Sequence, residues 1–459
     1  MLYAVLMRMA QLALRWYYRE IQTIGAERVP SGVPMLVVAN HPNALLDPML
    51  VATTMPRRLT FTGKATLFDK PLLPVFLRHV GVVPLRRASD EAARRAAGGA
   101  ADPRRNIEAF KAIVAALAAR NAVLIFPEGK SHDEPGMSPL KTGTARIALQ
   151  AIDAGVLDLV VLPVGLVFEN KAEPRSRVLV EVGDPLALSA WQASQPGGTA
   201  ESLTAEIDRR LRAVTINFTS AQHASDIVSV SHVLAGSGDE PQALGGGSRY
   251  SETVDLTRRV EAVRQSLAGA DAALVARADA LQERARMIRD TADTHGILIS
   301  DAAIDTGAGA AAIFVLRETA IAATAGPLAL WGRATHWIPL RIARTIARRG
   351  SRSGADPAMY TVVSGVVLVL ACYAAMSALV WLWTGPWWAL GFLASLPIVA
   401  TWDFRLRDRA ARARHRIRAF WRFRRQPELQ RELRAQLQSV REEATALERD
   451  VQRAAVTRA

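Results

Sequence analysis

The chain has 459 residues, half of them hydrophobic, and a formal charge of +14 at pH 7. This length and hydrophobic content exclude a disordered chain and predict two or three domains. Arginine supplies 51 of the 57 basic residues, and a basic excess of this size indicates an anionic partner, either a nucleic acid or a membrane surface.

Residues 1–20 predict an amphipathic helix. Arginines interrupt the apolar run and no small-residue cleavage site follows, which argues against a signal peptide. A helix lying in a membrane interface and a helix packed on the protein's own core fit the periodicity equally well. The apolar residues at helical spacing are Leu2, Leu6, Met9, Ala13 and Trp16.

Residues 21–217 predict an α/β domain with a central, mostly parallel sheet flanked by helices. Short apolar runs read as strands buried on both faces, and residues 106–121 read as a helix between two of them. Sites in such folds lie where strands end, and the polar motifs of this domain follow the apolar runs. The predicted strands are "PMLVVAN", "RLTFTG", "AVLIFPEG", "LVVLPVGL" and "RVLVEVGDP".

The first of these strands leads into "NHPNALLDP", which carries the candidate catalytic pair, His41 and Asp47. A histidine can take a proton from a hydroxyl group, and a carboxylate on its other ring nitrogen fixes the tautomer. The pair has no serine of its own, so the attacking oxygen would belong to the substrate, as in acyl transfer to an alcohol. Asn43 is expected to cap a helix with Asp47 on its first turn. A structural histidine at a strand end fits this stretch equally well.

Four separate motifs in this domain, taken together, resemble the glycerolipid acyltransferase family in order and spacing. The resemblance covers residues from about 20 to 215. Five residues separate His41 from Asp47, where the commonest family signature has four, so the local turn must differ. The longer spacing looks like the branch of fungal glycerol-3-phosphate and dihydroxyacetone-phosphate acyltransferases. The motifs are "NHPNALLDP", "GVVPLRR", "FPEGKSHDEPGMSPLKTG" and "VLPV".

The resemblance implies a role for each matching residue. His41 would be the general base and Asp47 its orienting partner. The acceptor phosphate would be bound by Arg87, with Glu128 and Gly129 completing the pocket and Lys64 and Lys141 as further candidates. Pro163 would shape the acyl-donor side. Arginine suits phosphate because its planar fork matches two oxygens.

The resemblance also implies the reaction, transfer of a fatty acyl group to glycerol 3-phosphate or dihydroxyacetone phosphate. The donor would be acyl-CoA or acyl carrier protein as co-substrate, with no cofactor and no metal. Lysophosphatidic acid is the alternative acceptor. A membrane lipid-binding protein that keeps the fold without turnover is the alternative of another class. Ser131, His132 and Asp133 are not expected to form a hydrolase triad, because adjacent side chains diverge.

The middle of the chain predicts a linker at residues 218–250, rich in glycine and serine, and a helical region at 251–357. A helical hairpin within this region is expected to break near Gly269. An apolar stretch at residues 310–332 contains Arg317 and Glu318 and is expected to be interfacial or packed against other helices.

Residues 358–402 contain no charged side chain until Asp403 and predict a transmembrane hairpin that turns at Thr384-Gly385-Pro386. A buried hairpin in a soluble protein is the alternative. Arginines flank both ends, so the positive-inside rule places both flanks and the catalytic domain in the cytoplasm, with the inner membrane of a bacterium as the expected location. The expected partners are therefore membrane lipids and the acyl donor, and no nucleic acid.

Residues 403–459 predict a basic helical tail. Apolar residues recur along its second half at coiled-coil-like spacing, which indicates a homodimer through this helix or a solvated amphipathic helix. The stripe consists of Leu429, Leu433, Leu437, Val440, Ala444, Leu447 and Val451.

Overall fold

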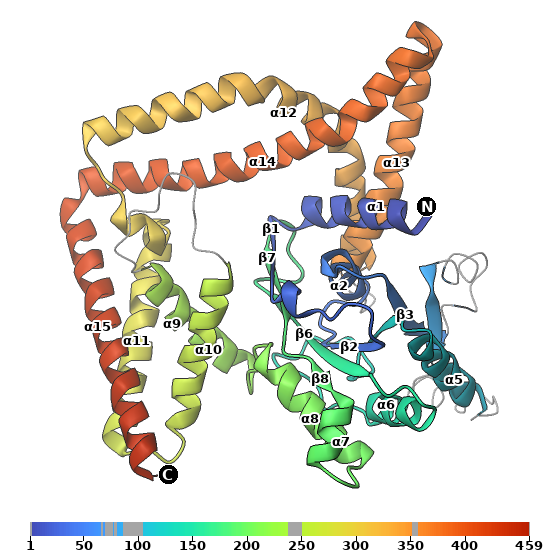
Figure 1. The fold of residues 1–459 in the computed structure, drawn as a ribbon. Helices are drawn as coiled ribbons and strands as arrows, with labels where there is room; N and C mark the ends of the chain where they lie inside the picture. The colour runs from blue at the N-terminus through green and yellow to red at the C-terminus, as the bar shows by residue number, and fades with distance from the viewer. Residues whose placement is uncertain are drawn as a thin grey trace. The chain divides into compact units, whose positions relative to one another are not determined.

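The computed structural model divides the chain into two units, which are described separately (Figure 1). Unit 1 comprises Met1–Asn217 and Ile346–Val363, and unit 2 comprises Phe218–Thr345 and Ser364–Ala459. Arg87, the predicted phosphate ligand, lies outside the described residues. The structure describes residues 2–65, 68, 77, 80–85, 104–236, 250–350 and 357–458.

Unit 1 contains an eight-stranded sheet, which confirms the predicted α/β class. The strand order is β1-β7-β6-β2-β5-β3-β4, and β8 pairs with β6. Neighbours are parallel except that β7 and β8 run antiparallel to β6. All five predicted strands are present, whereas β1, β4 and β8 were not predicted. The strands are β1 Glu20–Ile24, β2 Met35–Ala39, β3 Leu59–Lys64, β4 Val82–Leu85, β5 Ala122–Ile125, β6 Val160–Phe168, β7 Arg177–Val182 and β8 Leu186–Ala187.

Helices cover both faces of this sheet (Figure 1). Every residue of β2 and β5 is buried, because alternate side chains point to opposite faces and both faces are covered. Val37 belongs to the core shared with α1 and α2, and Val38 to the core shared with α5, α6 and α8. The helices of this part are α1 Leu2–Tyr17, η1 Ala26–Arg28, α2 Leu46–Thr54, α5 Arg104–Ala118, α6 Gly143–Asp153, α7 Leu188–Ser194 and α8 Ala200–Ala213.

The predicted amphipathic helix at residues 1–20 is α1. Leu14 and Tyr17, near its end, are buried in the core of unit 1, whereas Val5 is exposed. The last turns of α1 therefore pack on the protein's own core, which is one of the two alternatives stated for this helix. A membrane contact of the first turns stays a prediction.

Gly165 in β6 lies directly against the backbone that follows α8. A β-carbon at Gly165 would lie 1.9 Å from the carbonyl oxygen of Val214 and 2.6 Å from its carbonyl carbon. We expect Gly165→Ala to lower the free energy of unfolding by about 3 kcal/mol, because backbone atoms cannot rotate away from the added methyl group. Denaturant unfolding of the purified chain measures this change.

Gly143→Ala is the matched control for Gly165→Ala. Its added β-carbon would come no nearer than 3.9 Å to the Phe110 ring, and alanine favours a helix more than glycine does. We expect its unfolding free energy to equal or exceed that of the unchanged chain. Equal stabilities for the two variants would show that β6 and the segment after α8 separate easily.

Unit 2 is helical. One predicted feature needs correction here and another is confirmed. The first part of the predicted linker at residues 218–250 is helix α9, and residues 237–249 lie outside the described part. Gly269, with φ of 80°, ends the turn between α10 and α11 as predicted. The helices are α9 Ala221–Gly236, α10 Tyr250–Ser266, α11 Ala272–His295, η3 Ile299–Ala303, α12 Ala308–Gly350, α13 Pro357–Thr384, α14 Pro386–Arg425 and α15 Pro427–Arg458.

Three of the described helices, α12, α13 and α14, are long and apolar enough to cross a membrane. The predicted hairpin turn is present, because Gly385, with φ of 94°, separates α13 from α14. The predicted boundary between the hairpin and the basic helical tail, at residue 402, falls inside α14, which continues as one helix through the arginine-rich segment to Arg425. The stretch at residues 310–332, expected to be interfacial or packed, is part of α12 and meets the same length and hydropathy criteria as the hairpin helices.

The predicted tail, residues 403–459, is helical and comprises the last part of α14 followed by α15, which carries the apolar stripe. Its apolar stripe packs inside the chain, in a core shared with α9 and α11 that includes Leu437, Val440 and Ile288. Because these side chains are already buried within one copy, the stripe does not present a surface for the predicted homodimer.

Candidate active site

The candidate base and its partner meet just beyond the end of β2. His41 lies two residues after this strand, and Asp47 lies on the first turn of α2. The Nδ1 atom of His41 is 2.9 Å from Oδ2 of Asp47. Asp47 is fully buried, and the His41 side chain is 9% exposed. The predicted pair is therefore formed, in contact with each other and nearly closed to solvent.

The five-residue spacing is accommodated by the turn between the two residues. Ala44 takes a left-handed conformation with φ of 40°, which reverses the chain before α2 begins at Leu46. The backbone N–H of Asn43 donates to Oδ2 of Asp47 at 2.7 Å. The predicted cap by the Asn43 side chain is wrong, because that side chain donates to the Tyr18 hydroxyl and to the Lys171 carbonyl.

The imidazole ring of His41 is held in one orientation. It stacks on the Phe126 ring with centroids 4.0 Å apart and planes 14° apart. Because Nδ1 faces the Asp47 carboxylate, that nitrogen carries the proton and Nε2 keeps its lone pair. Among the described residues, no side chain forms a hydrogen bond with Nε2. Nε2 is therefore the atom that can accept a proton from a substrate.

Burial raises the pKa of Asp47 above its ordinary value, because the charged form loses its hydration. Hydrogen bonds from His41 and from the backbone of Asn43 oppose this rise, as does the positive charge of Lys171. The Oδ1 atom of Asp47 is buried without a hydrogen-bond partner. Keeping an ionised carboxylate here therefore has an energetic cost, as is typical of a functional carboxylate.

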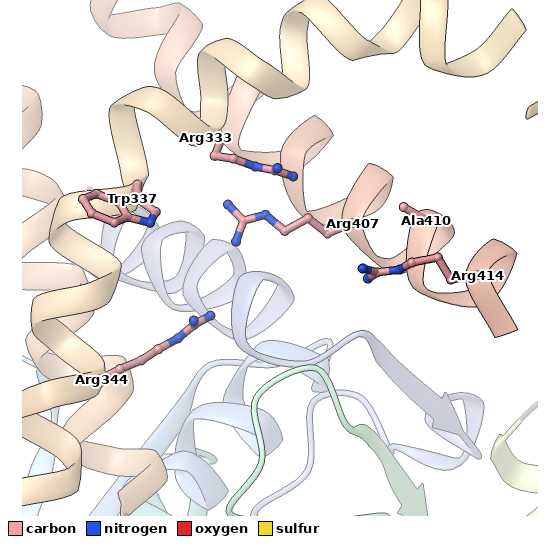
Figure 2. A pocket seen from close by; sticks show the side chains of 6 residues that line it. All are labelled: Arg333, Trp337, Arg344, Arg407, Ala410 and Arg414. Atoms are coloured by element: carbon pink, nitrogen blue, oxygen red, sulfur yellow. The ribbon is translucent and has the colours of Figure 1, made fainter. Parts of the chain in front are cut away.

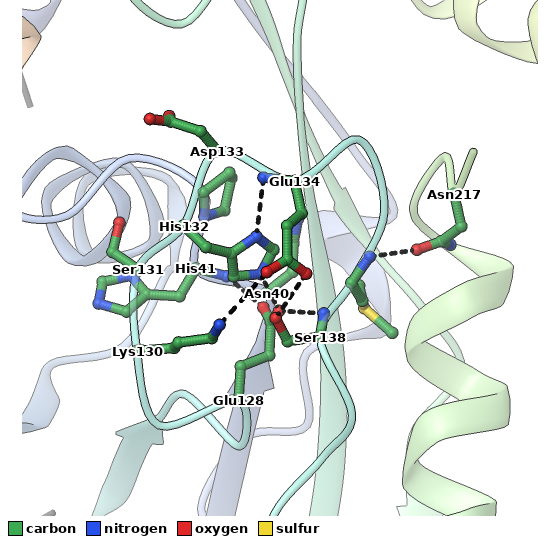
Figure 3. A network of polar contacts seen from close by, with 12 residues as sticks. Asn40, His41, Glu128, Lys130, Ser131, His132, Asp133, Glu134, Ser138 and Asn217 are labelled. Carbon is green, nitrogen blue, oxygen red and sulfur yellow. Dashed lines mark hydrogen bonds and ion pairs between the residues drawn. The ribbon is translucent and has the colours of Figure 1, made fainter. Parts of the chain in front are cut away.

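Glu128, from the loop after β5, connects the candidate base to the loop that carries Ser138 (Figure 3). One carboxylate oxygen accepts from the backbone N–H of His41 at 2.8 Å. The other accepts from the backbone N–H of Ser138 at 2.7 Å and contacts Nε2 of His132. Glu128 is 2% exposed. These contacts hold the main chain of His41 in place, a different task from the predicted one of completing a phosphate pocket.

Glu128→Gln should slow turnover by about tenfold and destabilise the chain by about 1 to 3 kcal/mol, the cost of a buried donor left unsatisfied. Glutamine has one acceptor oxygen, whereas the N–H groups of His41 and Ser138 need two. Turnover and the unfolding midpoint would be measured on the same preparation. Glu134→Gln is the control, because Glu134 is exposed in the same loop. Unchanged turnover for Glu128→Gln would show that this anchoring of His41 is dispensable.

The predicted phosphate ligands are brought only partly together. Gly129 adopts φ of 73° beside Glu128, and its α-carbon faces the Lys141 side chain, whose Cγ would lie 3.6 Å from an added β-carbon. Lys141 is exposed and anchored through its backbone N–H to the Pro127 carbonyl. Lys64 is the last residue of β3, at the same carboxyl edge of the sheet at which β2 ends. Lys64 and Lys141 are therefore the predicted phosphate ligands with a cationic side chain that lie within the described residues.

Pro163 lies in the strand predicted for it, and its expected influence on the acyl-donor side stays a prediction. It is buried in β6 opposite Val38 of β2, and its carbonyl accepts from the backbone N–H of Gly183. A side chain inside the sheet presents no surface to a ligand, so Pro163 can influence the acyl-donor side only through the position of β6.

Two residues of the site were not predicted. The amide of Asn40 exchanges two hydrogen bonds with the backbone of Leu166, which ties the end of β2 to β6. Lys171 donates to the carbonyls of Pro42 and His132, both at 2.8 Å. Asn40 stood in the motif itself, whereas Lys171 lies about 130 residues from His41 and no sequence pattern indicated it.

Ser131, His132 and Asp133 do not line up as a hydrolase triad (Figure 3). The Ser131 hydroxyl accepts from the backbone of Ala44, His132 contacts Glu128, and Asp133 pairs with Lys171 at 2.5 Å. Each side chain therefore has a partner outside the trio, and none serves as a nucleophile activated by the next.

Comparison with known proteins finds a family model and several relatives that match the part of the chain containing His41 and Asp47. Residues 20–167 match a family model described as acyltransferase. Two Saccharomyces cerevisiae proteins, glycerol-3-phosphate O-acyltransferases 2 and 1, are 34% and 40% identical over 24% and 16% of this chain. The matches span only 16% and 10% of those yeast proteins.

Two further proteins are similar over longer segments. An uncharacterized acyltransferase of Schizosaccharomyces pombe is 23% identical over 39% of this chain and 38% of its own length. The match to the crystal structure of the 1-acyl-sn-glycerophosphate acyltransferase PlsC from Thermotoga maritima covers 45% of this chain and 77% of the PlsC chain. Its sequence identity is 18% and its TM-score is 0.34.

Proposed function

We propose that the chain is a glycerolipid O-acyltransferase, a proposal supported by the match of residues 20–167 to the acyltransferase family model. It would transfer a fatty acyl group from a thioester donor, acyl-CoA or acyl carrier protein, to the hydroxyl group of glycerol 3-phosphate or dihydroxyacetone phosphate. The observation that carries this proposal is the buried contact of 2.9 Å between His41 and Asp47, formed without a nucleophilic side chain on Nε2 in the part of the chain that the structure describes.

In the proposed reaction, Nε2 of His41 takes the proton of the acceptor hydroxyl as its oxygen attacks the thioester carbonyl. The tetrahedral intermediate then collapses, the carbon–sulfur bond breaks, and the thiol leaves with the proton that His41 returns. Asp47 stabilises the imidazolium that exists between these two steps. Phe126 keeps the ring in the plane in which Nε2 faces the substrate.

The acceptor phosphate would lie near the carboxyl edge of the sheet. Lys64 and Lys141 supply positive charge there, and Arg87 is proposed as the bidentate ligand from the resemblance of its motif. Two observations support a glycerol 3-phosphate acceptor: both yeast relatives are named glycerol-3-phosphate O-acyltransferases, and five residues separate His41 from Asp47. Gly129 would let the main chain approach the phosphate, because it has no side chain.

The proposed setting is a membrane. The hairpin helices α13 and α14, which are long and apolar enough to cross a membrane, support this, together with the arginines that flank the hairpin. By the positive-inside rule the flanks and the catalytic domain would be cytoplasmic, and the inner membrane of a bacterium is the proposed location.

The experiment that tests this function is transfer of a labelled acyl group by the full chain in membranes. Glycerol 3-phosphate, dihydroxyacetone phosphate and lysophosphatidic acid are offered separately, each with acyl-CoA and with acyl carrier protein as donor. We expect glycerol 3-phosphate or dihydroxyacetone phosphate to be acylated fastest. Faster transfer to lysophosphatidic acid would replace the proposed acceptor, and donor binding without transfer to any of the three would favour a non-catalytic lipid-binding protein.

A further inference from the structure

Two segments of unit 2, residues 308–331 of α12 and 403–425 of α14, run side by side in opposite directions (Figure 1). We call them the helix pair. Glu318 of α12 accepts from Nε and Nη2 of Arg409 of α14 at 2.7 and 2.8 Å. Further along α12, a β-carbon added at Gly332 would lie 2.2 Å from the carbonyl oxygen of Val399. The contact on α14 therefore moves back toward the hairpin as α12 moves forward.

The two helices cross where the apolar part of the hairpin ends. Figure 2 shows Arg333 of α12 and Arg407 of α14 reaching toward each other, and Nε of each donates to Asp403, at 3.3 and 2.9 Å. Asp403 is the first charged residue after the apolar part of α14. The Trp331 ring lies edge-on to the Phe392 ring, with centroids 6.2 Å apart, so this side chain reaches back to the hairpin. Residues 308–330 of α12 therefore lead away from the hairpin.

The direction of the pair decides whether this part of α12 can cross a bilayer beside the hairpin. Residues 403–425 of α14 are rich in arginine, and arginine side chains in hydrocarbon are costly. The hydrogen bonds between Glu318 and Arg409 place the middle of the α12 segment at the depth of these arginines. Residues 308–331 are therefore not a third span beside the hairpin, although α12 has the length and hydropathy of one.

The α12 segment of the helix pair is nevertheless apolar and exposed. Between Ala308 and Trp331 the charged residues are Arg317 and Glu318, which pair with each other at 2.7 Å. A folded protein seldom leaves so many large apolar side chains of one segment in water. These side chains have exposed fractions from 45% to 74%, and they are Ile313, Val315, Leu316, Leu328, Leu330 and Trp331.

The surface of a bilayer suits both members of the helix pair. Apolar side chains of an in-plane helix enter the upper part of the acyl chains, and arginines beside them reach the phosphate headgroups. The pair also begins at the base of the hairpin, where a bilayer surface would lie. Pro397, inside α14 near the crossing, is a position at which a helix can bend away from the hairpin direction. The exposed arginines of the α14 segment are Arg405, Arg412, Arg414, Arg418, Arg422, Arg424 and Arg425.

We propose that the helix pair lies in the plane of the membrane surface, with the apolar side chains of α12 among the upper acyl chains and the arginines of α14 at the phosphate headgroups. This inference rests on the proposed membrane setting of the hairpin and not on the proposed acyl transfer. The pair would fix the depth of the hairpin, because its arginines cannot follow the hairpin into hydrocarbon.

The depth of α12 is tested with a fluorophore on single cysteines of the full chain. Cys372, the one cysteine of the sequence, is first removed by Cys372→Ala. Leu316→Cys then places the probe on the α12 segment. Two exposed leucines provide matched positions: Leu393→Cys lies midway along the apolar part of α14, and Leu157→Cys lies between α6 and β6 of unit 1.

The labelled chains are reconstituted into vesicles of phosphatidylcholine and phosphatidylglycerol. These vesicles contain lipids brominated either near the ester carbonyl or near the end of the acyl chain, and each bromine quenches fluorophores at its own depth. We expect the probe at Leu316 to be quenched severalfold more by the shallow bromines than by the deep ones. The probe at Leu393 should show the reverse preference, and the probe at Leu157 should be quenched by neither.

Two results at Leu316 would overturn the proposal while leaving the hairpin in the membrane. Deep quenching equal to that at Leu393 would show a third span. No quenching at Leu316, with Leu393 quenched, would show that water or another protein chain surrounds α12. If Leu316→Cys does not fold, Ile313→Cys, which is 60% exposed, replaces it and the same outcomes decide.

Absence of quenching at both Leu316 and Leu393 would overturn the proposal together with the membrane setting of the hairpin. Acyl transfer by the same labelled preparation is measured in parallel. Transfer that persists in that case would show that the proposed reaction holds although the membrane setting fails, so the two failures are distinguishable.

Discussion

His41→Ala is expected to lower the rate of acyl transfer by about a thousandfold, within the range that general base catalysis supplies. The physical reason is that Nε2 is the atom available to take the hydroxyl proton, since Nδ1 is engaged by Asp47 at 2.9 Å. Single-turnover transfer of a labelled acyl group in membranes measures this loss, with the variant's amount matched to the unchanged chain.

His132→Ala is the matched control for this change. His132 lies in the same network, but its Nε2 contacts Glu128 and its Nδ1 accepts from the backbone N–H of Glu134. Because both nitrogens are engaged, His132 has none left for a substrate, and we expect its removal to cost less than about tenfold. A larger loss for His132→Ala than for His41→Ala would show that the base has been assigned to the wrong histidine.

The second large effect is expected for Asp47→Asn, which should reduce the transfer rate by about a thousandfold or more, the scale seen when a base loses its orienting carboxylate. Asparagine can donate to Nδ1 of His41, which would reverse the tautomer and place the proton on Nε2. It also removes the negative charge that stabilises the imidazolium. The same single-turnover assay measures this loss.

Whereas the transfer rate of Asp47→Asn should fall, its stability at neutral pH should stay equal or rise. Burial raises the pKa of Asp47 in the folded chain, so its favourable contribution is present at low pH and is lost as the pH rises through the folded pKa. At neutral pH the unchanged chain therefore carries an ionisation cost that the asparagine variant does not. We expect the variant's unfolding midpoint to equal or exceed that of the unchanged chain at pH 7, and this advantage to shrink as the pH falls toward about 4, the ordinary pKa of an aspartate.

Asp133→Asn is the comparison for both readouts, because Asp133 is an exposed carboxylate of the same site that pairs with Lys171. Its transfer rate and its unfolding midpoint should change far less. If Asp47→Asn unfolds at a markedly lower temperature and Asp133→Asn does not, the buried carboxylate stabilises the fold and the functional assignment is wrong. Transfer within tenfold of the unchanged chain would contradict the dyad.

Most of the acyltransferase domain could be predicted because its central strands are continuous apolar runs. β2, β5 and β6 are buried on both faces, and such strands are recognisable from local sequence. β1 was missed because it is partly exposed and half polar, and β4, although apolar, is only four residues long, partly exposed and interrupted by Pro84. The break between α13 and α14 was predicted from Gly385 and Pro386. That α14 runs unbroken past residue 402 was not predicted, because the hydropathy of the sequence changes there whereas its helix propensity does not.

For the site, the sequence by itself determined the candidate base, its carboxylate and the need for an unusual turn, because these residues lie within seven positions of one another. Only the tertiary structure decided that Glu128 anchors the His41 backbone and that Lys171 holds the neighbouring carbonyls. It also decided that the apolar stripe of α15 is covered by its own chain. The physical reason is the same in each case: residue types and spacing specify local geometry, whereas the partner of a buried polar or apolar group is chosen by packing between segments far apart in the chain.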